Sequence, residues 1–355
     1  MHRILSLGLF LCVLTVFLLA ANGSFYKPGN IRAEKGLRAS LDPPPQDAQE
    51  ANFWKVEEDI RLYRFSYGEG RPVLVIHGGP GFPPSEPWPG LRALEQNFKF
   101  YYYHQRGCGK SSKPIDTFES QNYLQNMVKL DKLLGFSAQL ADIERIRRIL
   151  MQEKLLIVGH SWGGFMAALY AVEFPGHIDK LILVDPASML KMPVEEGLFE
   201  LIKALLPEQQ HAEYDAFLGQ YFDYGNIFKK SEKDLMQINL GFARFFGEAT
   251  KNLGIKIPGP ALADTDMVGG WMVHAQYFSL GMKFDYRPEL KNVKAPVLVI
   301  HGEKDLMPVS ASREYAELFS LGSLKVIPKA SHFPQMDQPR EFARVCADFF
   351  GIYFP

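Results

Sequence analysis

The chain has 355 residues, 47% of them hydrophobic, and carries 39 Lys and Arg against 40 Asp and Glu. This length and composition are those of a globular protein with a large core and room for an inserted subdomain. The net charge is −1, and no block of basic residues interrupts the mixture of acids and bases. Composition therefore argues against a nucleic-acid partner.

The first 23 residues differ in kind from the rest. Two polar residues precede an apolar run over residues 4–21, and small residues lie at the end of that run. This pattern predicts a secretory signal peptide, and the run is long enough to anchor the chain in a membrane if it stays uncut. We expect an exported protein that is secreted, periplasmic or membrane-anchored.

Residues 24–54 are rich in proline, including Pro43-Pro44-Pro45, and hold few large apolar side chains. This composition predicts an extended linker between the leader and the folded domain.

Short apolar runs recur along the remaining chain. They predict strands at 60–67, 73–77, 99–103, 155–159, 181–185, 297–302 and 324–327. Several runs are continuously apolar, which is typical of strands buried on both faces. Helical patterns lie between them, so we expect an α/β fold with a mostly parallel sheet covered by helices on both faces. Residues 55–188 and 291–355 would form this core.

The alternation of strands and helices stops between residues 189 and 290. This segment shows helical patterns, no convincing strand, many aromatic residues, and ten Lys and Arg against fourteen Asp and Glu. It predicts an inserted helical cap over an apolar pocket, with an acidic bias.

The sequence Gly159-His160-Ser161-Trp162-Gly163 follows a predicted strand and precedes an alanine-rich helical stretch. This is the nucleophile elbow pattern G-x-S-x-G in its expected setting. Only glycine fits two positions before and two positions after the serine when a strand turns this sharply into a helix. We predict that Ser161 is a nucleophile.

A serine hydroxyl needs a histidine to take its proton and a carboxylate to orient that histidine. In this kind of fold the chain order is serine, acid, histidine. Asp305 follows the strand at 297–302, and His332 lies in a later turn, which predicts the triad Ser161, Asp305 and His332. Asp185, at the end of an earlier strand, and Glu303 are rival acids.

Acyl transfer also needs N–H donors for the oxyanion. The backbone N–H of Trp162, directly after the serine, is one expected donor. The glycine-rich turn after the strand at 73–77 lets backbone approach the substrate closely, and Gly79 in that turn is the second expected donor.

These motifs resemble the α/β-hydrolase superfamily and, more narrowly, the proline iminopeptidase (prolyl aminopeptidase) family. The resemblance covers about residues 55–352 and includes the Asp305 and His332 segments together with His77-Gly78-Gly79-Pro80-Gly81, Gln105-Arg106-Gly107-Cys108-Gly109-Lys110-Ser111 and Gly159-His160-Ser161-Trp162-Gly163-Gly164. It implies release of N-terminal residues, usually proline, from small peptides, with acidic cap groups that hold the free amine.

The chain departs from that family at His104, where the family usually has an aspartate, and in the cap. Arg244-Phe245-Phe246-Gly247-Glu248 stands where the family usually has a tryptophan-rich stretch ending in glutamate, so Glu248 is the remaining candidate for one amine ligand. His274 occupies the position of a second glutamate in the cap of that family. A neutral imidazole cannot pair with an amine as a carboxylate does, so the pocket could instead accept an uncharged ester, amide or lactone.

The sequence therefore predicts a serine hydrolase that acts as a proline iminopeptidase-like aminopeptidase. The alternatives are a carboxylesterase or lipase-type hydrolase of small esters, amides or lactones, and a hydrolase fold that only binds a ligand. The expected partner is a small molecule or short peptide. No His or Cys cluster has metal-ligand spacing, Cys108 and Cys346 predict no disulfide, and no nucleotide motif is present. We expect no cofactor and no metal.

Overall fold

The computed structural model describes residues 24–194, 197–255 and 265–354. The predicted leader, residues 1–23, lies outside these ranges. Within them, no helix combines the length and the apolar character that crossing a bilayer requires.

The centre of the fold is an eight-stranded sheet of order β1-β2-β4-β3-β5-β6-β9-β10. From β4 to β10 neighbouring strands run parallel, whereas β1 and β2 join the edge as antiparallel strands. The strands are β1 Phe53–Glu57, β2 Ile60–Tyr67, β3 Arg71–Ile76, β4 Phe98–Tyr103, β5 Leu155–His160, β6 Ile178–Val184, β9 Val297–Gly302 and β10 Gly322–Ile327. All seven predicted strands are present, and β1 was missed.

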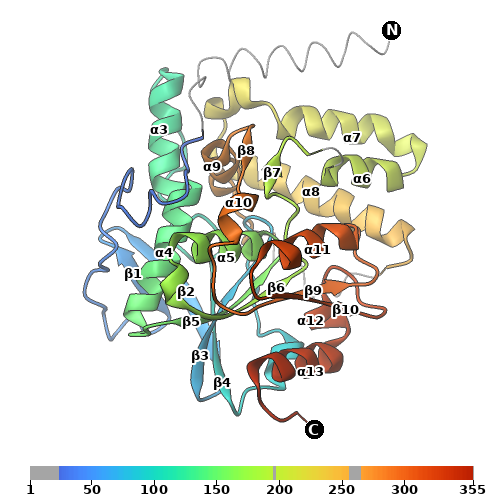
Figure 1. The fold of residues 1–355 in the computed structure, drawn as a ribbon. Coiled ribbons are helices and arrows are strands. Elements are labelled where there is room, and N and C mark those ends of the chain that lie inside the picture. Colours follow the sequence, from blue (N-terminus) through green and yellow to red (C-terminus); the bar gives the residue numbers. More distant parts are fainter. Residues whose placement is uncertain (1–23, 195–196, 256–264, 355) are drawn as a thin grey trace.

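Apolar side chains of the inner strands alternate between two buried layers. Leu74 and Ile76 of β3 belong to the same buried cluster as residues of helices α4, α5 and α11, whereas Val73 and Val75 belong to a second cluster with residues of α2 and α13. Helices α4, α5 and α11 and helix α13 lie on different sides of the sheet (Figure 1). Burial on both faces explains why these strands read as continuous apolar runs. The helices of these layers are α2 Pro89–Arg92, α4 Phe136–Ile149, α5 Trp162–Glu173, α10 Arg287–Leu290, α11 Val309–Leu318, α12 Pro334–Asp337 and α13 Pro339–Phe350. Helix α3 Tyr123–Leu134 instead packs in a third apolar cluster with residues from the segment between β6 and β9.

The segment between β6 and β9 is mainly helical. It contains α6 Leu198–Leu205, α7 Glu208–Tyr221, α8 Glu232–Asn252 and α9 Trp271–Leu280, and α6, α7 and α8 lie together apart from the sheet (Figure 1). Two strands that the sequence did not predict, β7 Lys191–Met192 and β8 Phe284–Asp285, pair antiparallel and join the two ends of this segment. Two-residue strands are too short to produce an alternating pattern.

The predicted linker over residues 24–54 is not extended: residues 24–50 pack against the domain, and β1 begins within the predicted range at Phe53. Tyr26, Ile31 and Leu41 are at most 2% exposed and belong to the core on the α5 face of the sheet. Backbone N–H groups of this segment also donate to the carbonyl of Ser279 at 2.9 Å and to the carboxylate of Glu173 at 2.8 Å. Isolated apolar residues in a proline-rich stretch thus fill separate gaps in the core.

A buried cluster of four charges lies beneath this segment. The Arg106 guanidinium contacts Glu57 at 2.8 Å and Asp142 at 2.6 Å, and Arg145 contacts the same Glu57 carboxylate at 3.0 Å. Arg145 also donates to the carbonyl of Ser40 at 3.0 Å. The cluster therefore joins β1, the loop after β4, α4 and the N-terminal segment.

Candidate active site

Ser161 occupies the sharp turn between β5 and α5. Its φ of 53° and ψ of −119° lie in a region that non-glycine residues rarely adopt, and its N–H donates to the carbonyl of Val184 at 2.8 Å. Such strain persists only where the surrounding structure enforces it. The turn thus holds one serine in a fixed orientation at the end of the central strand.

Close approach of backbone explains the two glycines of this turn. A Cβ at Gly159 would meet the carbonyl oxygen of Gly163, and a Cβ at Gly163 would collide with the carbonyl oxygens of Ile76 and His77. The requirement for glycine here comes from contact with neighbouring backbone, since neither residue has a positive φ.

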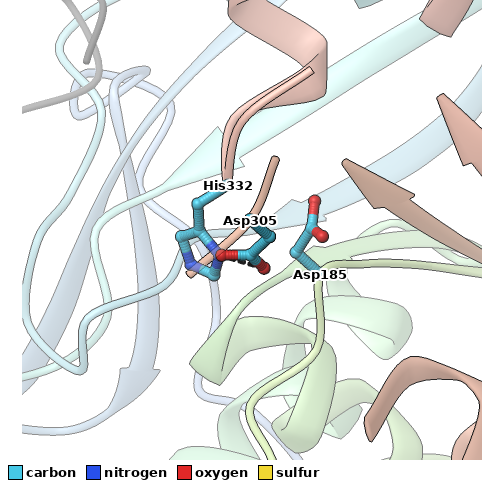
Figure 2. A group of neighbouring side chains, drawn as sticks. All are labelled: Asp185, Asp305 and His332. Carbon is cyan, nitrogen blue, oxygen red and sulfur yellow. Dashed lines mark hydrogen bonds and ion pairs between the residues drawn. The ribbon is translucent and has the colours of Figure 1, made fainter. Parts of the chain in front are cut away.

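Asp305 and His332 come from the loops after β9 and β10 and are hydrogen-bonded to each other. His332 Nδ1 lies 2.9 Å from Asp305 Oδ2, and the two side chains are 13% and 1% exposed. The bond uses Nδ1, so Nε2 is the ring nitrogen that can receive a proton from a neighbouring group. Figure 2 shows the carboxyl group of Asp305 facing the imidazole.

Burial and charge oppose each other in this pair. Burial alone would lower the pKa of His332, but the neighbouring carboxylates, Asp305 first, outweigh it and raise the pKa above its usual value. Burial alone would raise the pKa of Asp305, but His332 outweighs that effect and the pKa is lowered. The geometry therefore favours an ionised Asp305 that stabilises a protonated imidazole.

A second histidine supports the loop that carries His332. His160 Nε2 lies 2.7 Å from the carbonyl oxygen of His332, and the two rings are 4.9 Å apart. Because a carbonyl can only accept, His160 donates from Nε2. Burial lowers the pKa of His160 to about 3, so the ring is a neutral donor that fixes the loop.

The glycine-rich turn that contains Gly79 lies at the same site. Gly79 has a φ of +120°, which only glycine adopts readily, and it lines the same cavity as Ser161 and Trp162. His77 holds the turn: Gln105 donates its backbone N–H to His77 Nε2 at 3.2 Å, and His77 Nδ1 donates to the Gly78 carbonyl at 2.9 Å. Trp162 is the first residue of α5, where backbone N–H groups have no acceptor within the helix.

A cavity of about 600 Å³ opens beside these residues. Ser161, His332, Trp162 and Gly79 lie on its wall, and most of the remaining wall comes from apolar side chains of the segment between β6 and β9. These are Met189, Met192, Val194, Leu198, Phe199, Leu218, Phe222, Phe242, Phe246, Phe278, Leu280 and Met282. The structure thus brings Ser161 and His332 to one apolar cavity.

The two predicted cap ligands do not line this cavity. Glu248 on α8 is half-buried, and its Oε2 has no hydrogen-bond partner among the described residues. His274 on α9 is buried against the rings of Tyr221 and Tyr224, and burial lowers its pKa to about 3. His274 is therefore a neutral side chain of the helical segment's core.

His104, which also departs from the expected family pattern, is buried beside the loop after β4. It accepts the backbone N–H of Lys110 on Nδ1 at 3.0 Å, and its Nε2 lies 3.2 Å from the carbonyl oxygen of Pro84. Burial lowers its pKa to about 4. His104 thus ties two loops together without charge.

Two acidic residues on the cavity wall were not predicted as ligands. Asp185, one of the two rival acids, is fully buried, whereas Glu200 on α6 is exposed. The other rival, Glu303, is exposed and accepts the backbone N–H of Lys329 at 2.8 Å. The helical pattern around Glu200 could not show which face of α6 meets the cavity.

Among the described residues, Asp185, Asp305 and His332 are the group whose ligand-type atoms converge, all within 4.8 Å of one another. These three residues are the ones that could approach one ion together. In the structure, His332 and Asp305 are hydrogen-bonded to each other as a base and an acid.

The strand order, the helices on both faces and the turn after β5 define an α/β hydrolase. The sequence profile of the alpha/beta hydrolase fold matches residues 71–339, so the chain belongs to this family. This confirms the predicted fold class.

Similar proteins carry peptidase and esterase names. A proline iminopeptidase of Heyndrickxia coagulans is 27% identical over 79% of this chain and 91% of its own length. One from Lactobacillus delbrueckii subsp. lactis is 24% identical over 78% and 89%. An esterase from Exiguobacterium antarcticum has a similar fold, with a TM-score of 0.58 and 19% identity over 82% of this chain and 96% of that one. The predicted resemblance to proline iminopeptidases is thereby confirmed as sequence similarity.

Proposed function

We propose that this protein is a serine hydrolase in which Ser161, His332 and Asp305 act as a triad. The observation that carries the proposal is that Ser161 and His332 line one cavity while His332 Nδ1 is hydrogen-bonded to a buried Asp305. That bond fixes the tautomer in which Nε2 can act as a base.

In the first step His332 Nε2 takes the proton of the Ser161 hydroxyl as its oxygen attacks the carbonyl carbon of the substrate. The imidazolium that forms is stabilised by Asp305, and it then gives the proton to the leaving oxygen or nitrogen. Water, deprotonated by the same imidazole, cleaves the acyl-enzyme and regenerates Ser161. The backbone N–H groups of Trp162 and Gly79 are the proposed donors to the oxyanion in both steps.

The cavity supports an uncharged, apolar acyl group on the substrate. Its wall is mostly apolar, His274 is neutral and lies outside it, and Glu248 does not reach it. A buried ammonium group needs a carboxylate partner, because leaving a charge unpaired in a low-dielectric site costs several kcal/mol. Esters, amides or lactones with an apolar acyl group therefore fit the walls best.

An aminopeptidase of the proline iminopeptidase type is the second candidate. Two observations support it. The similar sequences are named proline iminopeptidases, and the exposed carboxylate of Glu200 lies on the cavity wall. Glu200 is the residue that would hold a substrate amine, in place of the predicted Glu248 and His274.

Matched chromogenic substrates separate the two candidates. We would compare a 4-nitrophenyl acyl ester with prolyl-4-nitroanilide and N-acetylprolyl-4-nitroanilide, using wild-type protein and Glu200→Gln. We expect rapid ester cleavage, no preference for a free amine, and little effect of Glu200→Gln. Cleavage of the free prolyl substrate that needs its amine and falls in Glu200→Gln, but not in the control Glu208→Gln outside the cavity, would overturn the ester assignment.

We also propose export of the protein through residues 1–23, on the basis of their apolar run. Peptide mapping of the N-terminus after expression in the native host tests this. A mature chain that begins near residue 24, or a full chain in the membrane fraction, is expected. A full-length chain that is recovered free in the cytoplasm would contradict it.

A further inference from the structure

Asp185 lies at the end of β6, next to the proposed triad, and is held in an unusual conformation. Its φ is +41°, which non-glycine residues rarely adopt, and its backbone N–H donates to the carbonyl of Ile300 at 2.8 Å. Its side chain is fully buried, and Oδ1 accepts the backbone N–H of Gly302 at 2.9 Å. Backbone strain and a buried carboxyl group together indicate that this orientation is enforced.

The second oxygen of Asp185 has no hydrogen-bond donor among the described residues. Ligand-type atoms of Asp185, Asp305 and His332 all lie within 4.8 Å of one another. Figure 2 shows Asp305 between His332 and Asp185. Two ionised carboxylates in such a buried place repel each other strongly, so one of them is expected to hold a proton.

The surroundings decide which carboxyl group is ionised. Asp305 faces the imidazole of His332 at 2.9 Å and also accepts the backbone N–H of Met307 at 3.2 Å. Asp185 has the single backbone N–H of Gly302 and, at 3.0 Å from Oδ1, His301 Nδ1, a ring whose pKa is lowered by burial. The surroundings of Asp305 therefore stabilise a negative charge better than those of Asp185. In agreement, burial and then Asp305 raise the pKa of Asp185 well above its usual value.

We propose that Asp185 is a positioning residue that carries a proton on its unpartnered oxygen and donates this O–H to the carboxylate of Asp305. The acid of the site is then a carboxylic acid–carboxylate pair with one negative charge. This goes beyond the proposed triad, and only its kinetic test rests on that triad. The donated hydrogen bond orients the carboxylate that orients the imidazole, and it satisfies an oxygen that otherwise has no partner.

The groups that face the carboxyl pair set its charge. His301 of β9 faces Asp185, and His332 from the loop after β10 faces Asp305. Ser312 of α11 contacts His301 at 3.0 Å. A proton on Asp185 keeps a second negative charge away from His332. That charge would raise the pKa of the imidazole further, so that less of it would be in the neutral form that can accept a proton at neutral pH.

Infrared spectroscopy tests the proton directly and does not require activity. Wild-type protein labelled with 4-¹³C-aspartate would be measured at pH 8, where Asp131 is ionised because burial raises its pKa only to about 6. We expect the carbonyl stretch of one protonated aspartic acid, shifted by the label. The band should disappear in Asp185→Asn and persist in Asp179→Asn, a control on the same strand whose carboxylate pairs with Arg71 at 2.8 Å.

Absence of this band in folded wild-type protein would overturn the proposal, whether or not the variants fold. A band that persists in folded Asp185→Asn would also overturn it, because the proton would then lie elsewhere.

Kinetics give a second test that a merely structural role would not pass. The amide of Asp185→Asn can still donate to Asp305, whereas Asp185→Leu cannot. We therefore expect kcat/KM for a soluble ester to fall about 10- to 100-fold further in Asp185→Leu than in Asp185→Asn, the usual effect of removing a hydrogen bond to a charged group. Equal losses in two folded variants would contradict donation by Asp185. If folded wild-type protein hydrolyses no ester at all, that result would instead refute the proposed triad.

Discussion

Replacement of Asp305 by asparagine is the sharpest single test of the proposed acid. The substitution Asp305→Asn keeps the size of the side chain but turns one acceptor oxygen into an NH2 group. The backbone N–H of Met307, 3.2 Å from Oδ1, needs an acceptor and favours the amide oxygen on that side. The NH2 group then faces His332 Nδ1, which in the native protein lies 2.9 Å from a carboxylate oxygen.

An NH2 donor opposite Nδ1 forces the imidazole to carry its proton on Nε2, the nitrogen that must act as the base. It also removes the charge that raises the pKa of His332. Reversal of the tautomer in the equivalent position of a known serine protease costs about 10⁴ in kcat. We expect a loss of about 10³ to 10⁴, or about 4 to 5.5 kcal/mol of transition-state stabilisation at 1.36 kcal/mol per tenfold.

Ester hydrolysis under saturating substrate measures the loss, and thermal unfolding checks that the fold is intact. Glu303→Gln is the matched control, because this rival acid lies two residues away, is exposed, and accepts a backbone N–H of Lys329. It should retain activity within about threefold. A loss of less than tenfold in folded Asp305→Asn, or an equal loss in Glu303→Gln, would refute the assignment of Asp305.

Three further predictions follow from the same contacts. Gly163→Ala should lower the free energy of unfolding by about 1–3 kcal/mol and reduce ester turnover, because its Cβ collides with the backbone of Ile76; unchanged turnover would be inconsistent with this. Arg106→Met should cost about 3–5 kcal/mol in urea unfolding by leaving buried carboxylates unpaired, whereas Arg71→Met at the surface should cost at most about 1; similar losses would count against the buried cluster. The raised pKa of His332 means that its imidazole keeps the proton to higher pH, so kcat/KM should fall as pH decreases through a midpoint above 6.5; a midpoint below 6.5 would argue against the carboxylate pair beside it.

Much of the sheet could be predicted because its inner strands are buried on both faces. The range 297–302 agrees to the residue with β9, which is buried throughout, and 60–67 agrees with the partly exposed β2. The elbow at Ser161 follows from glycines that backbone contacts require. These features leave local signals, since period, run length and glycine spacing are all written within a few residues.

Other features depend on partners far away in the chain and left no local signal. Tyr26 and Ile31 sit in a polar, proline-rich stretch, and only the completed core shows that they are buried. The same holds for the cavity. The aromatic composition of residues 189–290 predicted an apolar wall, but the helix faces that meet Ser161 decide that Glu200 lines the cavity and Glu248 does not.

The resemblance to proline iminopeptidases predicted the fold correctly but did not identify the cap residues that line the cavity. It is confirmed as sequence similarity, yet the cap positions it pointed to, Glu248 and His274, lie away from the cavity. Ser161, Asp305 and His332 follow β5, β9 and β10 and lie outside the segment between β6 and β9, so their proposed roles can be tested without knowledge of the natural substrate.

The most direct test of the central claim is the rate at which a fluorophosphonate probe modifies the protein, with the adduct located by mass spectrometry. We predict a single adduct on Ser161, formed at least about a hundredfold more slowly in His332→Ala, because the imidazole supplies the base. Folded wild-type protein that is not labelled at Ser161 would contradict the claim and would favour a hydrolase fold that only binds its ligand. Equal labelling rates in wild-type protein and His332→Ala would contradict the role of His332 as the base.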